Sequence, residues 1–407
     1  MRVALYSQDG LGLGHLRRTS TIAARLLEVR PDASVLSICD SPADQLFVPT
    51  RRFDRLKLPT IVKRSAGVWH APALGGDVAD VLRLRADLLR AALLAFLPDL
   101  VLVDHMPHGA MGELVAGLEE LRRANPDTRI VLGVRDIIDS PEVVRARWTV
   151  EGGYDAIERL YDRVLVYGSR DVYPLDDLYA FSASVRARTR YCGYVVARGA
   201  EVGRLAARRS LFPDLDADRP LVAVLGGSGH DAAAMMASAV AAAEGTGWAT
   251  AIVCGPNMAE DHRRELADTL PAGRGWVLPT VPSTDALLAA ADVCVAMAGY
   301  NTTTEILASG VRGVLVPRAG PSLEQRTRAR LFADRGWVRT VEPDALTPAS
   351  LRHEVRASLA DAPAFDGRRL RVAARGPDLG GADAAVAAML DLLDDVDRRS
   401  MPAAARA

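Results

Sequence analysis

Two segments in the first half of the sequence contain the residue types of a proton-transfer site. The run Gly10–Arg18, GLGLGHLRR, follows a predicted strand and brings His15 to the start of a predicted helix. Asp104 ends another predicted strand and is followed by His105. Ligands of open α/β sheets bind at the carboxyl ends of the strands, and a histidine there can serve as a general base near neutral pH. We therefore predict that His15 is a general base oriented by Asp104, with simple helix capping as the alternative role of His15.

A glycine-rich turn in the second half has the composition of a phosphate-binding loop. Gly226–His230, GGSGH, lies between a predicted strand and a predicted helix. Backbone N–H groups in such a turn, together with Ser228, can hold a diphosphate. The turn lacks the lysine of an ATP-binding phosphate loop, so ATP hydrolysis is not expected. The alternative is a tight strand-to-helix turn that needs small residues.

Another glycine turn follows in Ala298–Gly310, AGYNTTTEILASG. Glu305 lies a little over one turn into the helix that this segment predicts, where a carboxylate can bridge two ribose hydroxyls. The alternative is a glutamate that only favours the helix dipole. Gln325 begins a further predicted helix just past a strand end, and it is expected to point to the same place.

Short apolar runs alternate with longer amphipathic segments, which predicts an α/β fold with two doubly wound sheets. Predicted strands of the first half are Val3–Ser7, Ser34–Ile38, Leu100–Val103, Ile130–Val134 and Val164–Tyr167, and its helices are Arg17–Val29, Asp80–Ala95 and Gly112–Ala124. Those of the second half are the strands Leu221–Leu225, Ala249–Val253, Trp276–Leu278, Val293–Ala296 and Val314–Val316 and the helix His230–Ala243. We predict domains at residues 1–198 and 199–381, a C-terminal helix at 382–398 that packs back toward the first domain, and a flexible tail at 399–407.

The composition is that of a folded, two-domain enzyme. The chain of 407 residues is too long for one hydrophobic core, and its 49% hydrophobic and 25% charged residues are ordinary values. A formal net charge of −1 does not indicate nucleic-acid binding. The sequence has no signal-peptide pattern, no apolar run of membrane-spanning length and no metal-ligand spacing of its four cysteines. We therefore expect a cytoplasmic protein.

One loose basic segment, Arg51–Arg64, stands out from this even charge distribution. We expect it to be a solvated loop face. The alternative is a contact with an anionic substrate, or at most a peripheral contact with a membrane surface.

Taken together, these motifs resemble those of family 28 glycosyltransferases. The resemblance runs from Gly226 to about Gly336 and includes the GGSG turn, the segment Thr280–Asp285, the AGYNTTTEILASG stretch and the pair Glu324–Gln325. The run GLGHLRR is also similar to the GxGHxxR loop of a related nucleotide-sugar hydrolase. The resemblance implies the GT-B fold, in which two Rossmann-like domains face a central cleft. It further implies an inverting, metal-independent transfer of a sugar from a nucleotide donor, with UDP as the expected nucleotide.

The resemblance also implies roles for individual residues. Those implied to bind the donor are Gly226, Gly227, Ser228, Gly229, Val281, Gly299, Asn301, Thr302, Glu305, Glu324 and Gln325. Candidates for binding the sugar acceptor are Gly12, Gly14, Arg18, His105, His108, Arg135 and Asp136. The UDP-sugar would be a co-substrate, and no other cofactor is expected. No metal is expected either, because a site from Asp104 and two histidines lacks helical ligand spacing. Glu324 departs from the glutamine pair of the family, so the hexose contacts are expected to differ.

Three other functions stay open at this point. The same fold is used by hydrolases that pass the sugar to water and by nucleotide-sugar 2-epimerases. An epimerase needs several carboxylates that converge on the sugar, and the sequence does not reveal such a set. The third alternative is a non-catalytic nucleotide-sugar-binding protein, against which the presence of His15 argues.

Overall fold

The structure is a computed structural model in which the chain forms two compact units. Unit 1 consists of Met1–Val196 and Asp378–Ala407, and unit 2 of Ala197–Pro377. The structure describes residues 1–10, 12, 14–42, 51–65, 68–197, 202–227, 229, 231–271, 273, 275–361 and 376–400. The predicted boundary between residues 198 and 199 lies outside these residues, as does most of the predicted tail.

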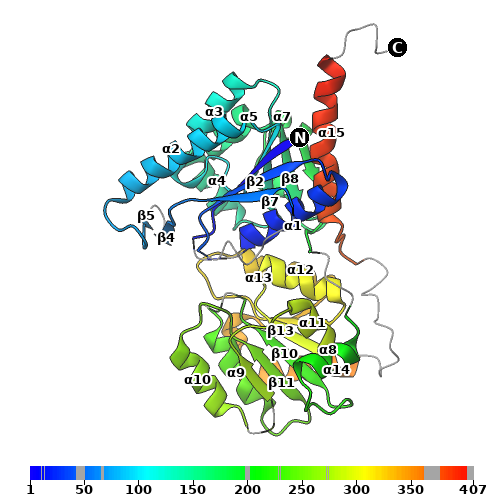
Figure 1. The fold of residues 1–407 in the computed structure, drawn as a ribbon. Coiled ribbons are helices and arrows are strands. Elements are labelled where there is room, and N and C mark those ends of the chain that lie inside the picture. Colours follow the sequence, from blue (N-terminus) through cyan, green and yellow to red (C-terminus); the bar gives the residue numbers. More distant parts are fainter. Residues whose placement is uncertain are drawn as a thin grey trace. The chain divides into compact units, whose positions relative to one another are not determined.

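Unit 1 is built on a parallel sheet with the strand order β3-β2-β1-β6-β7-β8-β9 (Figure 1). The strands are β1 (Arg2–Ser7), β2 (Ser34–Cys39), β3 (Phe53–Lys57), β6 (Leu100–Asp104), β7 (Arg129–Arg135), β8 (Arg163–Tyr167) and β9 (Thr189–Tyr191). The order reverses at β1, which pairs with β2 on one side and with β6 on the other. The carboxyl ends of β1 and β6 therefore flank the switch point, where doubly wound sheets bind their ligands.

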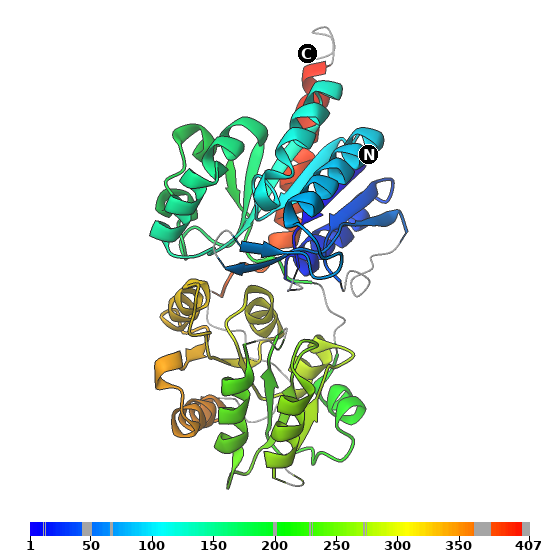
Figure 2. The same ribbon diagram turned by 90° about the vertical axis from the view of Figure 1, so that its left-hand side faces the viewer.

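Helices cover both faces of this sheet. α1 (Gly14–Val29) packs against α15 (Gly381–Ser400), and α2 (Val78–Phe96) packs against α3 (Val115–Ala124). Figure 2 shows α2 and α3 in front of the sheet and α15 behind it. An ion pair between Arg25 Nε and Asp383 Oδ1, 2.5 Å apart, joins α15 to α1. The remaining helices of the unit are the 3₁₀ helix Ala110–Gly112, α4 (Pro141–Val150), α5 (Gly153–Leu160), α6 (Leu175–Leu178) and α7 (Ala183–Ala187).

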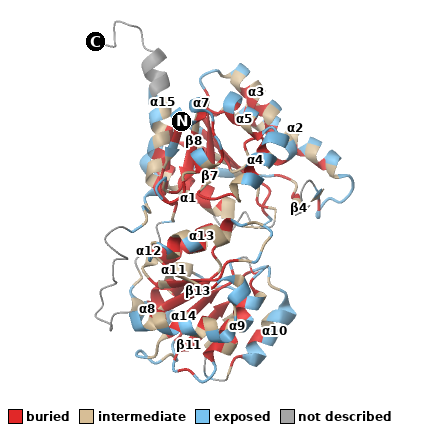
Figure 3. Ribbon diagram, turned by 180° about the vertical axis from the view of Figure 1, so that it is seen from behind, coloured by how far each residue is buried: buried red, intermediate tan, exposed pale blue. Residues whose placement is uncertain are grey.

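The local sequence explains these elements. Every residue of β6 is buried, as expected for a central parallel strand with helices on both faces, and the central strands of both units carry the buried colour in Figure 3. α2 begins after Asp77, whose side chain accepts a hydrogen bond from the Ala79 N–H at 2.9 Å. That bond satisfies one of the amides that the first turn of a helix leaves without a partner.

The prediction that Arg51–Arg64 is a loop face was wrong. β3 lies within this segment as the edge strand beside β2, and β4 (Val62–Ser65) pairs with β5 (Val68–His70) in an antiparallel hairpin. The sequence of β3, FDRLK, has charged residues among its apolar ones because an edge strand is covered less than a central one. It therefore lacks the continuous apolar run by which the central strands were predicted. The short strands β4, β5, β9 and β15 were likewise not predicted.

Unit 2 repeats the architecture with the strand order β12-β11-β10-β13-β14-β15. Its strands are β10 (Leu221–Leu225), β11 (Ala249–Val253), β12 (Gly275–Leu278), β13 (Val293–Ala296), β14 (Arg312–Leu315) and β15 (Arg339–Thr340). The order reverses between β10 and β13, so their carboxyl ends form the switch point of this sheet. The helices are α8 (Arg204–Leu211), α9 (Ala233–Ala243), α10 (Glu260–Thr269), α11 (Thr284–Ala290), α12 (Tyr300–Ser309), α13 (Glu324–Ala333), the 3₁₀ helix Pro343–Ala345 and α14 (Pro348–Asp361).

The core of unit 2 lies between the sheet and the pair α9 and α14. Buried members of this core include Val224, Met236, Ile252, Val295 and Leu351. The four cysteines of the chain are buried.

Candidate active site

The first candidate site centres on a contact between His15 and Asp104. His15 is the second residue of α1 and Asp104 the last residue of β6, so both lie at the switch point of the first sheet. Nδ1 of His15 lies 2.5 Å from Oδ2 of Asp104. The His15 side chain keeps 20% of its surface exposed, whereas the Asp104 side chain is fully buried. The sequence predicted this pair, and the structure brings the two residues into contact.

Arg18 holds Asp104 from the next turn of α1. Its Nε donates to Oδ1 at 3.0 Å and its Nη2 donates to Oδ2 at 2.7 Å, the bidentate geometry that strengthens an arginine–carboxylate pair. The Arg18 side chain is only 2% exposed and stacks over the ring of Tyr167. Arg18 was predicted to contact the acceptor, but its guanidinium is directed at Asp104 and buried with it.

The charges of this group fix the tautomer of His15. Burial by itself would raise the pKa of Asp104, but Arg18 and His15 hold it below its usual value. Asp104 is therefore a carboxylate at neutral pH and has no proton to donate. Because an arginine also has only donors, the proton in the short contact comes from Nδ1 of His15. Nη2 of Arg18 lies 2.9 Å from the same nitrogen but donates to Oδ2 of Asp104 at 2.7 Å. In the neutral ring, Nε2 then carries the lone pair that a general base needs.

His105 lies beside His15 and is held in an unusual backbone conformation. Its φ is 74°, a region that few residues other than glycine adopt, and its N–H donates to the Gly133 carbonyl at 2.7 Å. The ring centroids of His105 and His15 are 4.8 Å apart. Burial lowers the pKa of His105 well below its usual value, and the positive groups of His15 and Arg135 add to the effect. His105 is thus a neutral neighbour of His15 at pH 7.

His108, another predicted acceptor residue, is buried further along the same loop. Its Nε2 lies 3.9 Å from Glu151 Oε2. Burial lowers the pKa of His108, and the nearby Glu151 only partly opposes this effect. No contact of His108 tests its predicted role in binding the acceptor.

The remaining predicted acceptor residues also lie at strand ends of unit 1. Gly12 precedes α1 and Gly14 begins it. Arg135 is the last residue of β7 and is half-buried, and Asp136 follows it with its side chain buried. The positions agree with binding at the carboxyl edge of the sheet, and no contact of these residues tests the predicted role.

Two buried carboxylates at the same edge were not predicted. Asp9 follows β1 and Asp40 follows β2. Oδ1 of Asp9 accepts the backbone N–H of His15 at 3.0 Å, and Oδ2 of Asp40 pairs with Arg85 Nη1 at 3.1 Å. A signal was present in the sequence, since each aspartate has the same place after an apolar strand that singled out Asp104.

The second candidate site lies at the switch point of unit 2, where Gly226–Gly229 follows β10. A Cβ on Gly226 or on Gly229 would lie 2.6 Å from the carbonyl oxygen of Cys254, so the packing of the turn requires both glycines. Gly227 has a φ of 61°, and open space surrounds the place of its missing Cβ. Ser228, also predicted to contact phosphate, lies outside the described residues. Packing against Cys254 therefore accounts for Gly226 and Gly229, whereas the space beside Gly227 is open.

The helices that follow the two switch-point strands begin without a side-chain hydrogen bond from the N-cap residue. α9 begins at Ala233, three residues later than predicted, and its N-cap residue Ala232 makes no side-chain cap hydrogen bond. α12 begins at Tyr300 after Gly299, which likewise has no capping side chain. Amides at such helix starts favour an anionic ligand.

α12 carries the predicted ribose-binding glutamate. Glu305 is buried in the second turn of this helix, close enough to Cys294 for its charge to add to the burial that raises the pKa of that thiol. Asn301 and Thr302 occupy the first turn and are half-buried. Val281, the predicted base contact, follows β12 and is also half-buried.

The side chains of Glu324 and Gln325, the predicted sugar-binding pair, have different partners in the structure. Glu324 is buried, with Oε1 3.0 Å from Nη1 of Arg328, whose side chain is fully buried. The same Nη1 donates to the Ala298 carbonyl at 2.8 Å. Oε1 of Gln325 accepts the backbone N–H of Arg318 at 3.1 Å. Glu324 is thus engaged in an internal ion pair, and its Oε2 lies 3.9 Å from Nη2 of Arg318. No contact of Glu324 or Gln325 tests the predicted role in binding the hexose.

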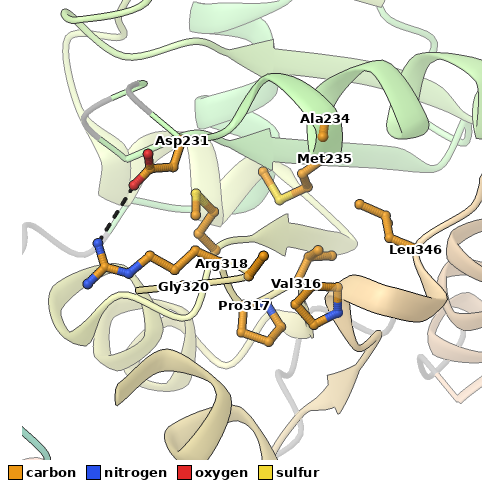
Figure 4. Close-up of a pocket in the computed structure, with 11 residues that line it drawn as sticks. Asp231, Ala234, Met235, Val316, Pro317, Arg318, Gly320 and Leu346 are labelled. Carbon is orange, nitrogen blue, oxygen red and sulfur yellow. Dashed lines mark ion pairs between the residues drawn. The ribbon is translucent and has the colours of Figure 1, made fainter. Parts of the chain in front are cut away.

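A pocket of about 320 Å³ lies beside the segment 316–320, which follows β14 in unit 2. Its walls are the apolar side chains Met235, Met297, Val316, Pro317 and Leu346, with Ala234, Ala319, Gly320 and Pro343 completing them. Figure 4 shows Asp231 and Arg318 facing each other at one end of it, with Oδ2 and Nη1 3.7 Å apart. The size lies at the lower end of the range for small-molecule sites.

Neither a metal centre nor a membrane span is found in the described part of the chain. No group of three or more histidine, cysteine, aspartate or glutamate side chains is placed there to hold a metal ion. No helix among the same residues is long and apolar enough to cross a membrane.

Comparison with known proteins agrees with this architecture. Residues 221–368 match the glycosyltransferase family 28 C-terminal domain. Over 194 residues the chain is 30% identical to the UDP-N-acetylglucosamine–N-acetylmuramyl-(pentapeptide) pyrophosphoryl-undecaprenol N-acetylglucosamine transferase of Corynebacterium efficiens. This alignment covers 47% of the chain and 51% of the relative, so the chain spans about half the length of that curated protein.

Solved structures resemble the chain over nearly its whole length. The calicheamicin glycosyltransferase has a TM-score of 0.61 at 19% identity, with 99% of this chain and 100% of that chain covered. MurG of Acinetobacter baumannii has a TM-score of 0.58 at 16% identity, with 96% and 99% covered. At these identities the likeness establishes the fold. The chain therefore has the GT-B fold, and residues 221–368 of its second unit match the glycosyltransferase family 28 C-terminal domain.

Proposed function

We propose that the protein is an inverting, metal-independent glycosyltransferase that moves a sugar from a nucleoside diphosphate donor to a hydroxyl group of an acceptor. The observation that carries the proposal is the group of His15, Asp104 and Arg18 at the switch point of the first sheet. A partly exposed imidazole directed by a buried carboxylate is the arrangement of a positioned general base.

In the proposed reaction, Nε2 of His15 takes the proton of the acceptor hydroxyl as its oxygen attacks the anomeric carbon of the sugar. The new carbon–oxygen bond forms while the bond from that carbon to the diphosphate breaks, and the nucleoside diphosphate leaves. His15 becomes an imidazolium, which the carboxylate of Asp104 stabilises through the Nδ1–H. Arg18 keeps that carboxylate in place, so the charge of Asp104 is available without rearrangement.

The proposed donor site is the switch point of the second sheet. The backbone around Gly227 and the first turns of α9 and α12 would hold the diphosphate, because amides at helix starts stabilise anions. These dipoles would supply the charge compensation for which other transferases use a divalent cation. Glu305 is proposed to accept hydrogen bonds from the ribose, and the pocket beside Arg318 to receive the sugar.

The first donor to test is UDP-N-acetylglucosamine, because the relative from Corynebacterium efficiens is named for it. A screen of nucleotide sugars by thermal denaturation would find the donor, since a ligand at 100 times its Kd stabilises the folded state by about 2.7 kcal/mol. Turnover with the best donor should persist in excess EDTA. A loss of turnover that Mg²⁺ or Mn²⁺ restores would contradict the metal-independent mechanism.

Product analysis separates transfer from the alternatives. A hydrolase would release free sugar without an acceptor, and an epimerase would return a nucleotide sugar of altered configuration. A transferase forms a new glycoside only when the acceptor is added. The cytoplasmic location and a peripheral membrane contact through Arg51–Arg64 stay predictions.

A further inference from the structure

Asp9 is a buried carboxylate of the first site to which the proposed reaction assigns no task. It follows β1, next to the strand that ends in Asp104, and is 3% exposed. Its neighbour carboxylates are each held by a buried arginine, Asp40 by Arg85 and Asp104 by Arg18. Oδ2 of Asp9 is buried and forms no hydrogen bond within the described residues. A buried polar atom without a partner is costly, which suggests that Asp9 is retained for a reason other than stability.

Hydrogen bonds connect Asp9 to His15 on one side and to Asp40 on the other. Oδ1 accepts the backbone N–H of His15 at 3.0 Å. The backbone N–H of Asp9 donates to Oδ1 of Asp40 at 2.6 Å. The first turn of α1, which carries His15, is thereby tied to the strand ends of the sheet through one side chain.

From this geometry we infer that Asp9 is the positioning residue of His15, and that it performs this task as a carboxylate. The inference rests on the proposed role of His15 as base. An ionised acceptor forms a shorter and roughly twice as strong hydrogen bond with an N–H as a neutral one. A negative charge is also favoured at the N-terminus of α1. When Asp9 takes up a proton, both effects are lost. The hydrogen bond from the His15 N–H to Asp9 then becomes weaker, and the first turn of α1 is positioned less rigidly.

The surroundings of Asp9 place its titration near the working range of an enzyme. Burial raises the pKa of Asp9 to about 6; the nearby charge of His15 opposes the shift, and the carboxylates of Asp104 and Asp40 add to it. Arg18 on α1 and Arg85 on α2 lie close by, but each is already paired with one of those carboxylates. Asp9 therefore changes charge within about one pH unit of neutrality, where an exposed aspartate stays ionised.

Carboxyl-labelled aspartate and NMR test the titration without any enzyme assay. In the full-length protein labelled with ¹³C at the aspartate carboxyls, the signal that disappears in Asp9→Asn belongs to Asp9. Its midpoint should lie near pH 6. A midpoint below about 4.5, the range of an ordinary aspartate, would overturn the inference.

A second spectrum tests whether Asp9 acts on position 15. In His15→Gln labelled with ¹⁵N-glutamine, the backbone amide at position 15 reports Asp9 without interference from an imidazole ring. Its shift should follow the Asp9 midpoint, and this phase should vanish when Asp9→Asn is added. An amide that does not respond to the titration of Asp9 would contradict the positioning role.

The pH profile of kcat/KM tests the consequence for turnover. Between pH 6 and 5 the wild-type value should fall more steeply than that of Asp9→Asn, because the proton that Asp9 takes up near pH 6 weakens the positioning of His15. Asp9→Asn keeps an acceptor oxygen but not the charge, so its plateau should be about tenfold lower, and the phase of the fall that follows the titration of Asp9 should be absent. The matched control is Asp77→Asn, which removes the charge of the carboxylate that caps α2 and should leave the steep wild-type fall unchanged.

These experiments separate the inference from the proposed function. If no nucleotide sugar is turned over but both NMR results hold, the coupling of Asp9 to position 15 stands and the proposed function fails. If turnover depends on His15 but Asp9→Asn keeps the steep fall and the full plateau, the inference fails while the proposed function stands.

Discussion

Nδ1 of His15 and Oδ2 of Asp104 lie 2.5 Å apart at the switch point of the first sheet, and the same carboxylate is held by both nitrogens of Arg18 that face it. His15 and Arg18 come from successive turns of one helix, whereas Asp104 ends a strand nearly ninety positions later. The contact therefore exists only in the folded sheet. Its chemical consequence is a defined tautomer, with Nε2 of His15 left to accept a proton.

Replacing Asp104 by asparagine should impair turnover more than binding. The amide keeps the shape of the side chain but cannot stabilise the imidazolium, so we expect kcat to fall by about 10²–10⁴-fold. Donor affinity measured by calorimetry should stay within about twofold. The asparagine also leaves the buried charge of Arg18 uncompensated, so activity is compared per folded molecule, with circular dichroism as the check. A variant with normal kcat would remove Asp104 from the mechanism.

Asp9→Asn should make unit 1 more stable at pH 8. The pKa of Asp9 is about 6 in the folded state, against 3.8 when unshifted. Above pH 6 the buried charge lowers the free energy of unfolding, and this penalty disappears as the pH falls from 6 toward 3.8, where the folded state alone holds the proton. A shift of about two units corresponds to about 3 kcal/mol.

Denaturant unfolding at pH 8 and pH 4 measures this effect. The difference between Asp9→Asn and wild type should be largest at pH 8 and close to zero at pH 4. A variant that is less stable than wild type at pH 8 would show that the charged form of Asp9 stabilises the fold, contrary to the expected sign.

The central strands and the contact between His15 and Asp104 could be predicted from the sequence. β10, β11 and β13 are continuous apolar runs because helices cover both faces of the sheet, and such runs are visible without a structure. The edge strand β3 was missed because its charged residues are those of a partly solvated strand. The role of Asp9 could not be predicted, since it depends on a bond to the His15 amide and on burial among other carboxylates.

Glu305→Gln should weaken donor binding without unfolding unit 2. A neutral amide replaces the charged acceptor proposed for the ribose hydroxyls, a loss of about 1.5–3 kcal/mol in binding free energy. Calorimetric titration with the nucleotide sugar measures it. Glu265→Gln, an exposed glutamate of α10 in the same unit, is the matched control and should bind the donor like wild type. Equal affinity of both variants would place the ribose elsewhere.

Glu324 and Gln325 should respond oppositely to replacement by alanine. Glu324→Ala leaves the fully buried Arg328 without its ion-pair partner, so we expect a loss of about 3–5 kcal/mol of stability. Gln325→Ala should change stability by about 1 kcal/mol or less but raise the donor KM. Thermal melts and donor saturation curves of the two variants check this. A stable Glu324→Ala with a raised donor KM would restore the contact with the sugar that the sequence suggested.

This division within one pair shows where sequence reasoning stops. The motif identifies both residues, but helix geometry and the position of Arg328 decide which side chain is internal. The glycines of the Gly226–Gly229 turn are a second example. Close approach to the Cys254 carbonyl requires two of them, so their presence in the sequence does not by itself indicate a bound phosphate.

The most direct test of the account is the single-turnover rate of His15→Gln with donor and acceptor both saturating. Glutamine retains a polar side chain of similar reach but cannot take up the acceptor proton. The account predicts a rate lower by about 10²–10⁴-fold, with donor affinity unchanged because the donor is assigned to unit 2. A variant that transfers sugar at nearly the wild-type rate would contradict the assignment of His15 as the base.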